Sequence, residues 1–400
     1  MTPQEASNRY HWCKYDKDNN TIELYLDHYM LSCLRTCEAK FYLEHLLNVK
    51  PRYTEPIEGQ VIRKPWFFDF GEYIHWCLEQ FYNHFKVHKT APLIDSWLGY
   101  CKHKWDMMKM DEYKDSVIKA DVTKYEEVKG WLGVAGLLTQ YYVFYMDMRL
   151  RVIDTEITFG HNKEVYLGGW LDVEEDNDLG IRPLVYKCYL TGRIDLLVDN
   201  GYKIGPVDHK TTHKFDGFEH KDFNPHDAMT GYILAIHEIL GKYYEELRDP
   251  NLACSPRLPE CKGGWIFHIS ACTPTTPRDK TKQQGPRFKT TPIDKTTSQL
   301  EDFKLRQLST FKRVAELLFN NKVPEWTTTN CHNMFFRDCE YVPIHEQPSE
   351  QWQDTINRFY TIGGSWDTRN HSKKDDIGTN GVLQTTGTSA QEGSISETTK

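Results

Sequence analysis

The chain has 400 residues, of which 39% are hydrophobic and 13% aromatic, and its formal net charge is −8 at pH 7. This apolar content excludes a wholly disordered chain, and the length allows one large domain with insertions or two modest ones. The acidic balance argues against a protein that coats nucleic acid. It does not argue against an enzyme that cuts it, since such an enzyme needs only a local basic groove together with acidic metal ligands.

Neither a membrane span nor a signal peptide is expected from the sequence. No apolar run approaches the ~20 residues that cross a bilayer, and residues 1–20 lack the apolar stretch of a signal peptide. The eleven cysteines are therefore expected to be reduced thiols or metal ligands. We expect a cytoplasmic protein with no membrane partner.

Hydrophobic periodicity predicts helices in the first part of the chain and strands after it. The predicted helices cover residues 26–49, 68–87 and 125–149. Alternation then predicts a strand over 152–159, with residues 166–173 as its neighbour.

A hairpin and two further helices are predicted in the second half. Residues 189–198 and 202–208 are the expected hairpin arms, because Asp199-Asn200-Gly201 between them tolerates positive φ. The remaining predictions are a helix over 225–241, a strand over 265–270, a long basic loop over 271–296, a helix over 297–320 capped by Thr296 and Gln299, and a disordered tail over 363–400. This order predicts an α/β fold, a mixed sheet flanked by helices with an N-terminal helical elaboration.

The predicted hairpin carries an unusual set of charges. Asp195 interrupts the apolar strand 194–198, and Asp208 and Lys210 lie two apart at the end of the second arm. Residues two apart in a strand point to one face, so Asp208 and Lys210 should meet, and Asp195 approaches both if the arms pair. An isolated Asp-x-Lys is often an ordinary pair of surface charges. The apolar context makes this one more specific.

Two neighbouring carboxylates repel one another, and a divalent cation removes that cost. Mg²⁺ prefers such oxygen ligands. It polarises a phosphate oxygen and lowers the pKa of a bound water. Lys210 would then orient that water or stabilise the charge on the phosphate, so Asp195, Asp208 and Lys210 together predict phosphodiester hydrolysis.

Gly192-Arg-Ile-Asp195 followed by Val207-Asp-His-Lys-Thr211 resembles the nuclease motif of the PD-(D/E)xK superfamily, in its RecB-like branch. That branch includes phage exonucleases and CRISPR-adaptation nucleases. The resemblance implies a restriction-endonuclease-like core with Mg²⁺ or Mn²⁺ on Asp195 and Asp208, the His209 carbonyl assisting, and Lys210 as the catalytic lysine. It implies a nuclease domain over 1–362, with a helical part at 26–149, a catalytic core at 150–270 and a C-terminal helix and Cys/His segment at 297–346.

Three further residues match positions of this branch. His75, four residues after Gly71 on one helix face, resembles the metal-binding histidine of an upstream helix; the alternative is a satisfied core histidine. Glu156 matches an acidic strand position with a structural or positioning role. Tyr232 matches the end of a Gln-x-x-x-Tyr motif and is expected to contact DNA or the lysine. The glutamine position holds Ala228, so His226 or Asp227 would have to replace the missing polar group.

The cysteines resemble those of the iron–sulfur members of the branch. Cys37 lies in an N-terminal helix, and Cys331, Cys339 and His345 lie near the C-terminus, where the family has three cysteines. This set implies a [4Fe-4S] cluster with one histidine, a Cys₃His zinc site, or a decayed site filled by packing. Cys33, one turn before Cys37, is a further candidate.

Taken together, these patterns predict a metal-dependent DNA nuclease, an exonuclease of recombination, replication or repair in a bacterium or a phage-infected host cell, with a helicase or recombination partner. The alternative is a catalytically weak DNA-binding or scaffold protein that keeps the nuclease fold. Basic residues with a nearby aromatic, Phe288, are candidates to neutralise phosphates and stack on a single strand, although charged loops are commonly only solvated; they are Lys214, Lys221, Lys280, Lys282, Arg287 and Lys289.

Overall fold

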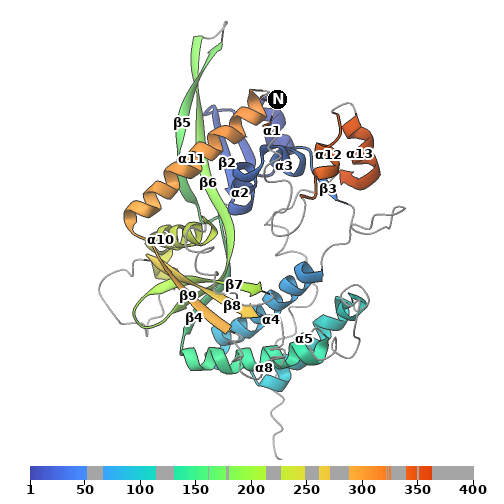
Figure 1. Cartoon of the computed structure of the whole chain (residues 1–400). Coiled ribbons are helices and arrows are strands. Elements are labelled where there is room, and N and C mark those ends of the chain that lie inside the picture. The colour runs from blue at the N-terminus through green and yellow to red at the C-terminus, as the bar shows by residue number, and fades with distance from the viewer. Residues whose placement is uncertain are drawn as a thin grey trace, which may run out of the picture. The chain divides into compact units, whose positions relative to one another are not determined.

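Eight strands form one mixed sheet (Figure 1). The central strand is β6 (Gly180–Asp199). Along the sheet the order is β1 (Cys13–Asp16), β2 (Thr21–Asp27), β6, β7 (Ile204–Thr212), β8 (Gly263–Ser270) and β9 (Phe288–Asp294), while β4 (Arg151–Phe159) and β5 (Val165–Asp176) also pair with β6. β2 with β6 and β7 with β8 are parallel, and the other pairs are antiparallel. The predicted α/β fold with a mixed sheet flanked by helices is therefore confirmed.

The computed structural model describes residues 1–51, 66–113, 130–160, 162–176, 180–212, 227–247, 261–270, 288–320, 322, 324–325, 339–348 and 351–362. Met1–Gly364 belong to one compact unit. Several predictions lie outside the described residues, namely the tail over 363–400 and the roles of Lys214, Lys221, His226, Lys280, Lys282, Arg287 and Cys331.

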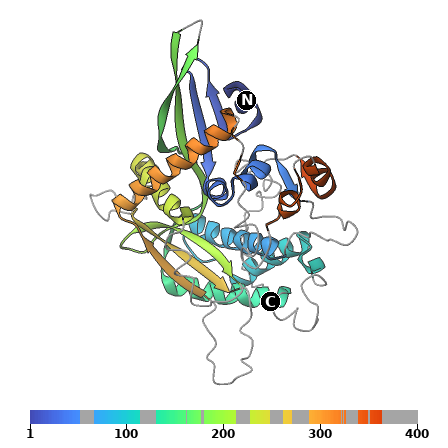
Figure 2. The same ribbon diagram turned by 45° about the horizontal axis from the view of Figure 1, so that its top comes forward.

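Helices cover both faces of the sheet (Figures 1 and 2). On one face, α4 (Trp66–His88), α5 (Ile94–Met107) and α8 (Trp131–Met148) bury their apolar side chains against Leu196 and Val198. On the other, α2 (His28–Thr36), α10 (Asp227–Leu247) and α11 (Thr297–Phe319) pack in a second core with Leu197. Leu196 and Val198 face one core and Leu197, between them, faces the other, so β6 lies between the two cores.

The predicted hairpin is confirmed as β6 and β7, with Leu196 paired to Val207 and Gly201 at φ +85° in the turn. The strand predicted over 166–173 lies within β5, but its neighbour is β6 and not β4. β6 is long enough to pair with β5 along its first half and with β4 along its second. The remaining predicted helices and the strand over 265–270 are present as α4, α8, α10, α11 and β8, and the Thr296–Gln299 capping box is formed.

The single helix predicted over 26–49 is wrong. Asp27 ends β2 and caps α2 by accepting the Met30 N–H at 2.8 Å. Cys37 is extended, with φ −160°, and separates α2 from α3 (Glu38–Phe41). A π-helical turn, η1 (Tyr42–Leu46), and the short strand β3 (Val49–Pro51) follow. The N-terminal helical elaboration is therefore preceded by two strands that extend the main sheet.

The loop predicted over 271–296 is wrong at its end, because residues 288–294 form β9 against β8. The described residues also include several short elements: α1 (Pro3–Arg9), a 3₁₀ turn η2 (Met110–Tyr113), α12 (Val342–His345), α13 (Trp352–Phe359) and β10 (Tyr360–Ile362), which pairs with β3. None of the helices in the described ranges has the length and apolar character needed to span a membrane.

Candidate active site

The site lies where β6 and β7 stop pairing. Their ladder ends at Leu196 and Val207, and the Asp195 carboxylate accepts the His209 backbone N–H at 2.8 Å. From Val207 onward β7 pairs in parallel with β8 instead. A side-chain oxygen thus replaces a strand partner, and the two acidic residues stand at the point where the strands separate.

Asp208 and Lys210 meet on one face of β7, as their spacing predicts. The Lys210 Nζ lies 2.9 and 3.1 Å from the two Asp208 carboxylate oxygens. Only 5% of Asp208 is exposed, whereas the Lys210 side chain is half-buried. Burial disfavours the ammonium, but the Asp208 carboxylate outweighs it and raises the pKa of Lys210. Lys210 is therefore a charged partner of a buried carboxylate.

A second pair joins the hairpin to α4. The His75 Nδ1 lies 3.4 Å from Asp195 Oδ2. Burial opposes the charged imidazole, but Asp195 outweighs it and raises the pKa of His75. Burial likewise opposes the carboxylate of Asp195, yet the charge of His75 holds the pKa of Asp195 well below its usual range. A Cβ on Gly71 would lie 3.4 Å from Thr211 Oγ1, so β7 approaches α4 closely at this glycine.

Two tyrosines, which the sequence did not reveal, fix the ring of His209. Its Nε2 lies 3.1 Å from the hydroxyls of both Tyr82 and Tyr141, which also bond each other. All three side chains are buried, and burial lowers the pKa of His209. The ring is neutral, and its Nδ1 lies 3.4 Å from Asp195 Oδ2. Because Tyr141 stands on α8, 68 residues from His209, no local sequence signal identifies this contact.

Glu156 stands on β4 beside Asp195 in a strained backbone, with φ +49°. Its neighbours Thr155 and Ile157 pair with Leu196 and Ile194, so Glu156 comes level with Asp195 between them. The Arg193 Nε lies 2.8 Å from the Glu156 Oε2. The two form an ion pair, but their orientation does not make a hydrogen bond. Burial, reinforced by the charge of Asp195, raises the pKa of Glu156 to about 8. The positioning role expected of Glu156 stays a prediction.

Tyr232 approaches the acidic residues from α10. It is 7% exposed and contacts Phe159 and His28 edge-on. Burial and then the charge of Asp208 raise its pKa, so its hydroxyl is neutral. Its predicted contact with DNA or Lys210 stays a prediction.

The position of the expected glutamine is buried, since Ala228 is 3% exposed. Asp227 is held by Arg35 at 2.5 Å and lies 3.6 Å from Arg306. Its carboxylate therefore serves an ion-pair network between α2, α10 and α11, and does not replace the missing polar group.

The donors of the site fit Mg²⁺ or Mn²⁺. Two carboxylates supply the hard oxygens that these ions prefer, and His75 adds a nitrogen beside Asp195. Each carboxylate is neutralised by its own partner, Lys210 or His75. The potential ligand atoms of His75, Asp195 and Asp208 do not all lie within 4.8 Å of one another, so a shared ion would require these side chains to draw closer.

The predicted iron–sulfur or zinc set is only partly described. Cys37 is buried, and its Sγ accepts the Lys40 N–H at 3.4 Å. Cys339 is half-buried and His345 ends α12, while Cys331 lies outside the described residues. Among the described residues, Cys37, Cys339 and His345 do not form a close group of three ligands. The four-residue set stays a prediction.

Phe288 packs against α8. Its ring stacks on Phe144 with centroids 5.1 Å apart and contacts Tyr141 edge-on, while the residue stays half-buried. The stacking role suggested for it stays a prediction. Lys289, next to it on β9, is the only one of the suggested basic residues within the described ranges.

Comparison with known proteins identifies the class. A model of the PD-(D/E)XK nuclease superfamily matches residues 28–344, a span that contains the hairpin, α4 and α10. The chain therefore belongs to the PD-(D/E)XK nuclease superfamily, whose members are generally phosphodiesterases that use divalent metals. A search of curated proteins found no match.

Among solved structures, the chain is similar to one titled "Crystal structure of SSO0001". The two are 11% identical over 54% of this chain and 72% of that one, with a TM-score of 0.18. We draw no conclusion from so low a score.

Proposed function

We propose that the chain is a Mg²⁺- or Mn²⁺-dependent deoxyribonuclease that removes nucleotides from DNA ends in recombination, replication or repair. The observation that carries this proposal is the pairing of Asp208 with Lys210 beside Asp195 with His75, at the point where β6 and β7 separate. Two carboxylates, a lysine and a histidine at one strand junction are the groups that metal-assisted phosphodiester hydrolysis requires.

Each residue has a defined task in this proposal. Asp195 and Asp208 hold the metal, with His75 and the His209 carbonyl as further ligands. The metal, when bound, supplies a Lewis acid for the phosphate and lowers the pKa of a water. Lys210 orients that water or stabilises the charge that develops on the phosphate. The neutral His209 ring, fixed by two tyrosines, keeps its backbone N–H on Asp195.

End-directed cleavage of DNA follows from the resemblance of the hairpin to the RecB-like branch, which includes exonucleases. The test compares linear duplex, linear single-stranded, closed circular and nicked DNA, and an RNA of the same sequence, in Mg²⁺ and in Mn²⁺. Loss of linear DNA with the closed circle intact supports the exonuclease. Cleavage of the closed circle at an equal rate contradicts end-directed action, and cleavage of RNA alone contradicts the DNA substrate.

Two variants distinguish the nuclease from the alternative, a catalytically weak DNA-binding or scaffold protein. Asp195→Asn and Lys210→Met should each lower cleavage by about 10²-fold or more. Lys203→Met is the matched control, because Lys203 pairs with Asp294 at the far end of the same strands. Equal residual cleavage in all four proteins, with DNA binding retained, would favour the scaffold.

A further inference from the structure

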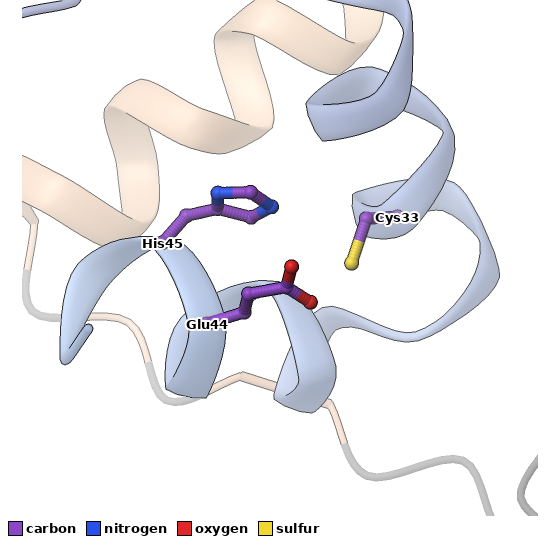
Figure 3. A group of neighbouring side chains, drawn as sticks. All are labelled: Cys33, Glu44 and His45. Carbon is purple, nitrogen blue, oxygen red and sulfur yellow. The ribbon is translucent and has the colours of Figure 1, made fainter. Parts of the chain in front are cut away.

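A close group of three potential metal ligands lies away from the active site. The ligand atoms of Cys33, Glu44 and His45 all lie within 4.8 Å of one another (Figure 3). Cys33 comes from α2, and Glu44 and His45 come from the π-helical turn η1. Among the described residues this is the only such group of three or more. It contains Cys33, a further candidate named from the sequence, but none of the predicted set Cys37, Cys331, Cys339 and His345.

Glu44 and His45 are adjacent residues of a π-helical turn, Tyr42–Leu46. This conformation is rare and is frequent at functional sites. Figure 3 shows the His45 ring and the Glu44 carboxylate both directed toward the Cys33 sulfur.

His45 offers a buried nitrogen without a hydrogen-bond partner, whereas Cys33 is a neutral thiol. His45 Nε2 is buried without a hydrogen-bond partner, and burial lowers the pKa of His45 to about 3, so its ring is neutral. Cys33 is 7% exposed, and burial raises the pKa of its thiol. The Tyr29 hydroxyl donates to the Glu44 carboxylate, with oxygens at 2.9 and 3.2 Å. Neutral imidazole is the form that binds metals, and a ligating carboxylate is commonly oriented by an outer hydrogen bond such as this one.

We propose that Cys33, Glu44 and His45 form a zinc site. Sulfur, nitrogen and one carboxylate oxygen are the donors that zinc accepts, whereas Mg²⁺ prefers oxygen alone. The ammonium of Lys40 opposes such an ion: burial lowers the pKa of Lys40, but the Glu44 carboxylate outweighs it and raises that pKa. Zinc offsets this repulsion when the Cys33 thiol releases its proton to solvent and binds as a thiolate, so that the site has two negative ligands.

Zinc at this position would stabilise the junction between η1 with β3 and the segment 339–362. Next to η1, Val49 packs in a small core with Tyr341 and Ile344, and the Tyr341 hydroxyl donates to the Val49 carbonyl at 2.8 Å. Strand β3 also pairs with β10. A metal that fixes α2 against η1 therefore also fixes the surface on which the C-terminal segment packs.

The experiment measures zinc in the full-length protein by elemental analysis and by competition with a chromophoric chelator. Wild type should bind one zinc per chain, and a cobalt-substituted sample should show a thiolate-to-cobalt charge-transfer band. Cys33→Ser, Glu44→Gln and His45→Gln should each weaken binding at least about tenfold. Cys188→Ala, a buried cysteine of β6, is the matched control and should keep the metal.

Three outcomes would overturn the proposal: no zinc and no cobalt band in wild type, zinc retained at full affinity in the His45→Gln and Glu44→Gln proteins, or a brown iron-containing wild type that loses its colour only in Cys37→Ser. The wild-type measurements do not depend on the folding of any variant. Asp208→Asn should keep this zinc, which separates the result from the active-site metal.

Discussion

The buried contact between Tyr82, Tyr141 and His209 allows a quantitative test of how the His209 ring is held beside Asp195. His209 is neutral and its Nδ1 faces Asp195 at 3.4 Å, so its Nε2 is an acceptor. Both tyrosine hydroxyls lie 3.1 Å from that nitrogen. If Tyr82 or Tyr141 alone is changed to Phe, the other hydroxyl still donates to Nε2. If both are changed, the buried nitrogen has no donor.

These two situations differ in free energy of unfolding. Loss of one buried hydrogen bond costs about 1 kcal/mol, and a buried acceptor without a partner costs a further ~1–3 kcal/mol. Each single variant should therefore lose about 1 kcal/mol and the double variant roughly 3–5 kcal/mol. The coupling energy between the two substitutions is then about 1–3 kcal/mol.

Urea unfolding of wild type, both single variants and the double variant measures this coupling. Tyr341→Phe is the control, because the Tyr341 hydroxyl donates to the Val49 carbonyl in a different core from that of Tyr82. Its combination with Tyr82→Phe should be additive. Additivity within about 0.5 kcal/mol for Tyr82 and Tyr141 would refute the assignment of His209 Nε2 as a buried acceptor shared by the two hydroxyls.

Three further substitutions test the packing and the charges of the fold. Gly192→Val places a Cβ 2.8 Å from the Phe159 ring, so the free energy of unfolding should fall by about 1–3 kcal/mol; an unchanged urea midpoint contradicts the packing. Arg313→Met removes a two-pronged bond to Glu38, at 2.6 and 2.7 Å, and should cost about 1–2 kcal/mol at pH 7. Burial opposes the ionised Glu38, but Arg313 outweighs it and lowers its pKa, so this cost should shrink as pH falls below about 4, and a pH-independent cost refutes it. Burial raises the pKa of Asp27 to about 6, so its charge destabilises the fold increasingly from pH 4 to pH 6. Asp27→Asn should raise the free energy of unfolding at pH 8 by up to about 3 kcal/mol and leave it unchanged near pH 4; a loss of stability at pH 8 contradicts this.

The hairpin was predictable because its determinants are local. Alternation along β6 and β7 and the turn at Gly201 fix which residues face each other. The Asp208–Lys210 contact follows from strand period alone. His75 needed the family resemblance, because only the tertiary fold brings α4 to Asp195.

The two wrong predictions, the helix over 26–49 and the loop over 271–296, arose where strand pairing depends on residues distant in the sequence. Residues 21–27 are nearly all buried, so their apolar run lacks clear alternation and continues without a break into α2. Their partner strand lies more than 160 residues away. Residues 288–294 hold Lys, Thr and Pro, which are common in loops, yet they form an edge strand, where Pro292 is tolerated.

Two features of the sites had no sequence signal. The hydroxyls of Tyr82 and Tyr141 meet His209 only when α4 and α8 pack on the sheet. Cys33 was a candidate from the sequence, but Glu44 and His45 meet it only where the turn η1 lies beside α2 in the folded chain.

The central claim, that this hairpin is a metal-dependent catalytic site, is tested most directly by the cleavage rate of end-labelled linear DNA with and without Mg²⁺, in wild type and Asp208→Asn. Asn keeps the shape of the Asp208 side chain and removes its charge. We predict cleavage by wild type that a chelator abolishes, and a loss of about 10²-fold or more in Asp208→Asn with the fold intact. Equal rates in the two proteins, or cleavage that does not depend on the metal, would contradict the account.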